Sequence, residues 1–170
     1  MNRFLVPALA LALAGCSSSP SGPAAGRSPT HADPAAMVAQ VRAVGATGRE
    51  IDVQPLRDPQ VQDLRDRAQQ LETQGRHRDA EALVDQALAI SVEDPDLLQW
   101  KAELALYRRA WADAEALAMR SFERGPKLGG LCRRNWATLQ HARAARGDAA
   151  GAAVARQRVV GCTVAPPVRM

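Results

Sequence analysis

Apolar and small residues recur at steps of three and four residues from Pro59 onward, which is the pattern of amphipathic helices. Runs of Val, Ile, Thr and aromatic residues, which favour strands, are absent. The pattern therefore predicts an all-α domain. Its four clearest stripes contain Val61, Leu64, Ala68 and Leu71; Ala80, Leu83, Val84, Ala87 and Ile90; Leu97, Leu98, Ala102, Ala105 and Leu106; and Ala114, Leu117, Ala118, Ser121 and Phe122.

The pentapeptide DAEAL occurs twice, at Asp79–Leu83 and at Asp113–Leu117, with an offset of 34 residues. Each copy follows a predicted turn, and each turn follows another helical stripe. The repeating unit is therefore two antiparallel helices joined by a turn.

A helix–turn–helix unit of 34 residues resembles the tetratricopeptide repeat (TPR). Small residues are needed where two helices approach to about 8 Å. Gly75 fits the turn inside the first unit, whereas Arg109 at the equivalent place in the second unit departs from the pattern. The resemblance implies that the repeat-packing positions are Leu64, Ala68, Ala80, Ala87, Leu98, Ala102 and Ala114.

A third unit is weaker. The stretch GDAAGA at Gly147–Ala152 resembles the turn and the start of a second helix, but Gln140 and Arg143 stand where small or apolar residues are expected. Either a degenerate repeat or a capping helix pair fits, since terminal repeats are often atypical. We therefore expect a short TPR-like α-solenoid of two clear helix pairs and one degenerate pair.

The first sixteen residues, MNRFLVPALALALAGC, have a basic residue, Arg3, followed by an apolar stretch too short to span a bilayer. The motif LAGC at Leu13–Cys16 resembles the bacterial lipobox, which implies cleavage before Cys16 and lipidation of its thiol. An ordinary signal peptide with an incidental cysteine is the alternative. Ser17, rather than the aspartate that retains lipoproteins in the inner membrane, favours the outer membrane with the domain facing the periplasm. The inner membrane and the cell surface are less favoured.

The stretch after Cys16 is rich in Ser, Pro, Gly and Ala, so it is predicted to be a flexible tether. The apolar positions Met37, Val38, Val41 and Val44 indicate a short helix at Ala35–Val44. The predicted organisation is a signal peptide (1–15), the lipidated cysteine and tether (16–35), an N-terminal extension without determined structure (36–58), a repeat domain (59–162, with units 59–92, 93–127 and 130–162) and a disordered tail (163–170).

The net charge of +4 is unevenly distributed. The segment Asp79–Glu123 has ten acidic and four basic residues, whereas Gly130–Met170 has seven arginines and one aspartate. Such counts commonly reflect solvated helix faces. The alternative is a basic end that faces anionic lipid, lipopolysaccharide or an acidic partner. Secretion argues against nucleic acid as a partner, despite the overall basicity.

Cys132 and Cys162 are the two remaining cysteines, an even number for an oxidising compartment. They lie at equal distances from the turn at Gly147, so an antiparallel hairpin brings them to the same level. We expect a disulfide between them. Two buried free cysteines are the alternative.

No catalytic residue, cofactor site or metal site is predicted. His31, His77 and His141 lack metal-ligand spacing, and neither a nucleophile elbow nor a phosphate-binding glycine loop is present.

The TPR resemblance implies that the first helices of the repeats line a concave groove that accepts an extended peptide or a helix. For each position assigned to this groove, ordinary solvated surface is the more frequent alternative. The candidate groove residues are Gln62, Arg65, Gln69, Glu72, Thr73, Asp96, Gln99, Glu103, Leu106 and Tyr107.

These features predict a non-enzymatic lipoprotein that is anchored to the membrane through Cys16 and acts as an adaptor for an envelope protein or peptide segment. Cell-wall enzymes, secretion pores and pilus parts are candidate partners. An assembly chaperone or pilotin-like factor for an outer-membrane, secretion or pilus subunit is the second hypothesis, and an envelope hydrolase is a remote third.

Overall fold

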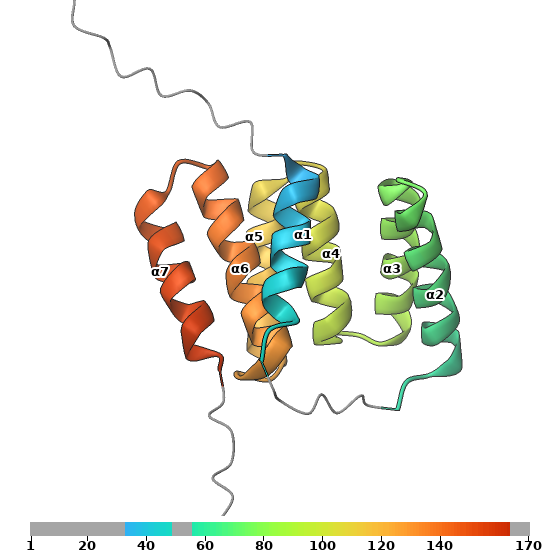
Figure 1. The fold of residues 1–170 in the computed structure, drawn as a ribbon. Coiled ribbons are helices and arrows are strands. Elements are labelled where there is room, and N and C mark those ends of the chain that lie inside the picture. The colour runs from blue at the N-terminus through green and yellow to red at the C-terminus, as the bar shows by residue number, and fades with distance from the viewer. Residues whose placement is uncertain (1–32, 49–55, 164–170) are drawn as a thin grey trace, which may run out of the picture. The chain divides into compact units, whose positions relative to one another are not determined.

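The computed structural model describes residues 33–48 and 56–163, which form α-helices and no strand (Figure 1). The predicted all-α helical-repeat class is therefore confirmed. The segment predicted to be a signal peptide, Cys16 and residues 164–170 of the predicted tail lie outside the described residues. The helices are α1 (Pro34–Gly45), α2 (Pro59–Thr73), α3 (His77–Ile90), α4 (Pro95–Tyr107), α5 (Trp111–Arg124), α6 (Gly129–Ala145) and α7 (Ala149–Gly161).

An Asp-Pro dipeptide starts three of these helices, α1, α2 and α4. The aspartates Asp33, Asp58 and Asp94 are the N-caps, and each carboxylate accepts a hydrogen bond from a backbone N–H of the first turn at 2.7–3.1 Å. Proline suits the first helical position because its missing N–H would have no intrahelical partner there. The local sequence thus sets where these helices begin.

The three helical hairpins α2–α3, α4–α5 and α6–α7 share one turn geometry. A residue with positive φ follows the first helix of each hairpin: Gly75 (74°), Arg109 (59°) and Gly147 (84°). The next backbone N–H then donates to the carbonyl five residues earlier, at 2.9–3.0 Å in all three cases. This is the helix-terminating arrangement that glycine normally favours, so Arg109 adopts the same turn as Gly75 despite carrying a side chain.

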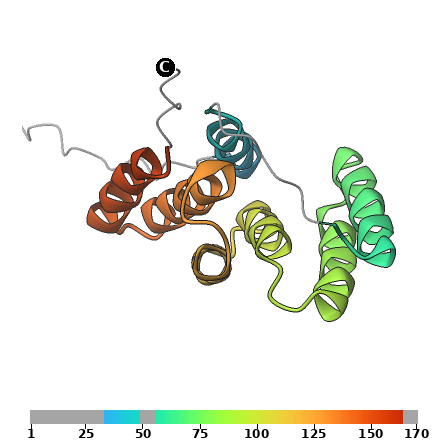
Figure 2. The same cartoon turned by 90° about the horizontal axis from the view of Figure 1, so that it is seen from below.

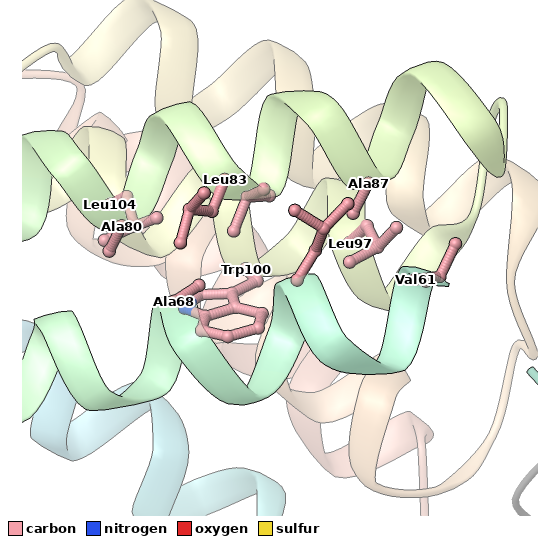
Figure 3. Packing of buried hydrophobic residues seen from close by; sticks show 10 residues of the cluster. Val61, Ala68, Ala80, Leu83, Ala87, Leu97, Trp100 and Leu104 are labelled. Atoms are coloured by element: carbon pink, nitrogen blue, oxygen red, sulfur yellow. The ribbon is translucent and has the colours of Figure 1, made fainter. Parts of the chain in front are cut away.

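Each hairpin packs against the next through neighbouring helices, α3 against α4 and α5 against α6, as two views of the fold show (Figures 1 and 2). The residues assigned to repeat packing are buried. Each is at most 9% exposed: Leu64, Ala68, Ala80, Ala87, Leu98, Ala102 and Ala114. In Figure 3, Ala68, Leu83 and Trp100 meet where α2, α3 and α4 converge.

The N-terminal extension contains the helix α1 (Pro34–Gly45), at the place where the sequence indicated a short helix, Ala35–Val44. The tether predicted for 16–35 ends earlier, because Pro34 and Ala35 already belong to α1. Val38 and Val41 of α1 are fully buried against α4 and α6, where they join the cluster that includes Ala105 and Leu106. Figure 1 shows α1 in front of these two helices, running alongside them.

Cys132, near the start of α6, and Cys162, after the end of α7, are joined by a disulfide with their Cα atoms 5.7 Å apart. Both residues are 1% exposed. The backbone N–H of Gly129 donates to the carbonyl of Cys162 at 2.7 Å beside this bond. The open end of the third hairpin is therefore closed by a covalent bond and a backbone hydrogen bond.

Replacing Ala80 or Ala114 with leucine is expected to lower the free energy of unfolding by about 1–3 kcal/mol, because both positions are fully buried and have no space for added methylenes. Urea denaturation followed by circular dichroism measures the effect. Ala89→Leu, at an exposed position of α3, is the control and is expected to stay within about 0.5 kcal/mol of the wild type. Unchanged stability of both core variants would contradict the packing described.

Reduction of the Cys132–Cys162 bond, or the double change to serine, is expected to lower the free energy of unfolding by about 3–4 kcal/mol, since the bond closes a loop with a sequence separation of 30 residues. Thermal melts with and without reductant measure the difference. Peptide mass spectrometry without reductant provides the check on oxidation state. Two free thiols in protein recovered from the periplasm would contradict the pairing.

Candidate functional site: a cleft between α1 and α2

A cleft of about 700 Å³ lies between α1 and α2, on the side of the repeat formed by the first helices of the hairpins. Residues of α4 and α6 complete its walls. A volume of this size is typical of ligand-binding pockets. We call this site the cleft, and its lining residues are Arg42, Gly45, Ala46, Arg65, Gln69, Glu72, Pro95, Asp96, Trp100, Pro126, Gly130, Leu131 and Arg134.

The cleft is bordered by a network of charged side chains centred on Glu103 of α4, which has no exposed surface. The Nε atom of Arg42 donates to Glu103 Oε2 at 2.8 Å, and the Nε atom of Arg134 donates to Glu103 Oε1 at 2.8 Å. Burial alone would lower the pKa of Arg42, but the carboxylates of Glu103 and Glu72 outweigh it, so its pKa lies above the usual value. The buried carboxylate thus attaches α1 and α6 to α4.

Glu72 of α2 connects the same network to the other wall. Arg42 Nη2 donates to both carboxylate oxygens of Glu72, at 2.9 and 3.1 Å, and the indole Nε1 of Trp100 donates to Glu72 Oε2 at 2.7 Å. The Arg42–Glu72 pair therefore joins α1 to α2 at one end of the cleft, and the indole hydrogen bond fixes the Trp100 ring in its wall.

Two further side chains hold α6 and α1 in place. Gln99 Nε2 donates to Glu103 Oε1 at 3.0 Å and to Thr138 Oγ1 at 2.8 Å, which links α4 to α6 inside the core. Arg133 of α6 donates to the carbonyls of Val44 and Gly45 at 3.2 and 3.3 Å. A cation at these last carbonyls stabilises the C-terminus of α1.

The structure divides the predicted groove residues into three groups. Arg65, Gln69, Glu72 and Asp96 line the cleft. Gln62 and Thr73 lie on exposed surface of α2 outside the lining.

The remaining groove assignments are corrected by α1, which covers the face of α4 that an open groove would present. Gln99, Glu103 and Leu106 have no exposed surface and are structural residues of the core. Tyr107 is partly buried and stacks on His77 with ring centroids 3.8 Å apart, away from the cleft lining, and its burial raises its pKa.

The acidic middle segment neutralises part of the basic C-terminal segment. Arg134 pairs with Glu103, and Arg143 and Arg146 both pair with Glu115 of α5 at 2.8 Å. These three arginines are therefore paired within the domain, which weakens the alternative of a basic end that faces an anionic partner.

Two histidines, His77 and His141, lie within the described residues. No group of three or more His, Cys, Asp or Glu side chains able to hold a metal lies within residues 33–48 and 56–163. His77 stacks on Tyr107, and burial lowers the pKa of His141 on α6. Neither belongs to the cleft lining.

Sequence reasoning missed Arg42, Trp100 and Arg134, which form the cleft together with the predicted α2 residues. The sequence indicated a helix at Ala35–Val44, and the Asp-Pro start at Asp33, shared with Asp58 and Asp94, marks where α1 begins. No sequence pattern indicated where α1 packs.

No protein-family model and no curated protein matches the chain. Among solved structures, the chain is similar to the globular C-terminal domain of P. aeruginosa LpoP, with 31% sequence identity and a TM-score of 0.57. The match covers 62% of this chain and 99% of that domain.

Glu103→Gln is expected to lower the free energy of unfolding by about 2–3 kcal/mol, because it leaves two arginines facing a buried neutral amide. Arg42 keeps some exposure to solvent, which places the effect below that of a fully buried pair. Urea denaturation measures the change. Glu123→Gln, at an exposed site of α5, is the matched control and is expected to be close to neutral. Equal stability of the two variants would show that the network contributes little.

Proposed function

The helical domain of this chain belongs to the family of the LpoP C-terminal domain, and on that premise we propose that the protein is an adaptor that binds another protein of the bacterial envelope through the cleft. The proposed partner is a cell-wall enzyme, a secretion pore or a pilus component. The proposal assigns no catalysis and no cofactor to the chain.

The cleft is the observation that carries this proposal. Its volume of about 700 Å³ is sufficient for several side chains of an extended segment. Its lining combines an aromatic ring, Trp100, with apolar Leu131 and with polar Gln69. Such a mixture of apolar surface and placed polar groups is typical of protein-recognition sites.

We further propose that the domain is held at the outer membrane, facing the periplasm, by lipid attached to Cys16. This part of the proposal rests on the LAGC motif and on Ser17. Within the described residues, no helix is long and apolar enough to cross a membrane. Because α1 begins at Pro34, the proposed tether would lead directly into a helix that borders the cleft.

Photo-crosslinking in intact cells tests the adaptor function. A photoreactive amino acid at Gln69, which is exposed and lines the cleft, is expected to capture an envelope protein that mass spectrometry then identifies. The matched control is the same amino acid at Gln86, an exposed glutamine of α3 outside the cleft lining, which is expected to capture little.

The pattern of captured proteins separates the competing roles. Constitutive capture of one or several envelope proteins supports an adaptor, whereas transient capture of one newly made subunit supports an assembly chaperone. The same proteins captured from Gln69 and from Gln86, or none from Gln69, would refute the cleft as the binding site. Repeating the experiment with Cys16→Ser tests the contribution of the anchor.

A further inference from the structure

One cation of the cleft differs from the others in its surroundings. Arg65 of α2 lines the cleft and is partly buried, with its guanidinium carbon 5.4 Å from the centre of the Trp100 ring. Its Nη1 atom is buried and has no hydrogen-bond partner within the described residues. A buried guanidinium nitrogen without an acceptor is unfavourable, so natural proteins seldom leave one unpaired.

The other charged groups of the cleft already have opposite charges beside them. Arg42 pairs with Glu72 and Glu103, and Arg134 also pairs with Glu103. Asp96 accepts from Arg57 Nη2 at 2.7 Å. No ion pair within 4.0 Å joins Arg65 to an acidic residue of the described chain, and the lining therefore has one positive charge in excess.

The pKa of Arg65 agrees with an excess of positive charge in the cleft lining. Burial is the main cause of a lowered pKa for its guanidinium, and repulsion from Arg57 adds to the effect. The nearby carboxylates of Asp96 and Asp94 counteract it only in part. An anionic group placed in the cleft would restore the missing compensation.

Apolar groups surround this cation. The Trp100 ring lies beside it, and Pro95, Pro126 and Leu131 line the cleft as well. A free inorganic anion would satisfy the charge but would leave this apolar surface in water. A peptide segment with an acidic residue next to an apolar residue satisfies both, because the planar guanidinium matches a carboxylate in a two-point hydrogen bond.

We propose that Arg65 is the recognition residue for a carboxylate of an extended acidic segment of the partner protein, with a neighbouring apolar side chain of that segment lying against Trp100 and Leu131. The inference rests on the proposed function, since it takes the cleft as the protein-binding site. Glu72 and Asp96 are held by their own arginine partners and do not compete for Arg65 in a direct ion pair.

Selection of peptides from a random library tests this inference. Phage displaying peptides of about 12 residues are selected on the full-length protein in detergent, on Arg65→Gln and on Arg67→Gln. Arg67 is the matched control, because it lies on the same helix but is exposed and pairs with Asp63 at 3.5 Å. Acidic residues are expected to be enriched on the wild type and on Arg67→Gln, and not on Arg65→Gln.

A double-mutant cycle then measures the interaction between Arg65 and the acidic residue of the peptide. In a selected synthetic peptide, replacing the enriched Glu with Gln is expected to weaken binding to the wild type about tenfold. The same replacement is expected to change binding to Arg65→Gln less than about twofold, because the partner charge is already absent. Calorimetric titration gives the dissociation constants, and Arg65→Lys, which keeps the charge, is expected to retain part of the preference.

The outcomes separate this inference from the proposed function. Peptides that bind the cleft, as shown by loss of crosslinking from position 69, but have no acidic preference overturn the role of Arg65 and leave the adaptor function standing. An acidic preference that persists in Arg65→Gln overturns it equally. If no peptide is selected and no protein is captured from position 69, both proposals fail. Circular dichroism melts verify that each variant is folded, and Arg65→Met, which removes the charge but keeps an apolar stem of similar length, replaces Arg65→Gln if the latter is not.

Discussion

The structure depends on the pairing of one buried carboxylate, that of Glu103. A charge without exposed surface is tolerated only when opposite charges and hydrogen-bond donors surround it, and here the donors come from Arg42 of α1, Arg134 of α6 and Gln99 of α4. Because Arg42 also holds Glu72 of α2, the network connects all the helices that border the cleft. The site and the packing of the first helices are therefore parts of one electrostatic arrangement.

The position of α1 converts a groove into a cleft. In a bare helical repeat, the first helices of the hairpins present an open concave face to a ligand. Here α1 buries Val38 and Val41 on that face and covers Leu106 and Glu103, so only the part next to α2 stays accessible. A shorter, more enclosed site recognises fewer residues of a partner, but it excludes more water from each contact and strengthens the electrostatic ones.

Many of the charged side chains are also paired within the domain. The acidic middle segment and part of the basic C-terminal segment neutralise each other between α4, α5 and α6, so the net charge of the chain says little about its partner. The informative charge is the one at Arg65, which lies against Trp100 and has no acidic side chain in an ion pair with it in the described part of the chain. A single unmatched charge in a partly apolar site favours a specific ligand more than a charged outer surface does.

The sequence by itself determined the local features of the fold, namely the helices, the turns between paired helices and the small residues at their contacts. Helical periodicity, alanines at close crossings and the turn at Gly75 act over a few residues, so they predicted the hairpins and the buried positions Ala80 and Ala114. Tertiary structure alone decided where α1 packs, because the sequence of a short amphipathic helix shows which of its faces is buried but not which other helices bury it. That long-range contact made Gln99 and Glu103 core residues and recruited Arg42 and Arg134 to the cleft. The sequence does not distinguish a polar side chain that faces water from one that pairs with a buried group of a distant segment. The packing of the helices decides which of these environments the side chain has.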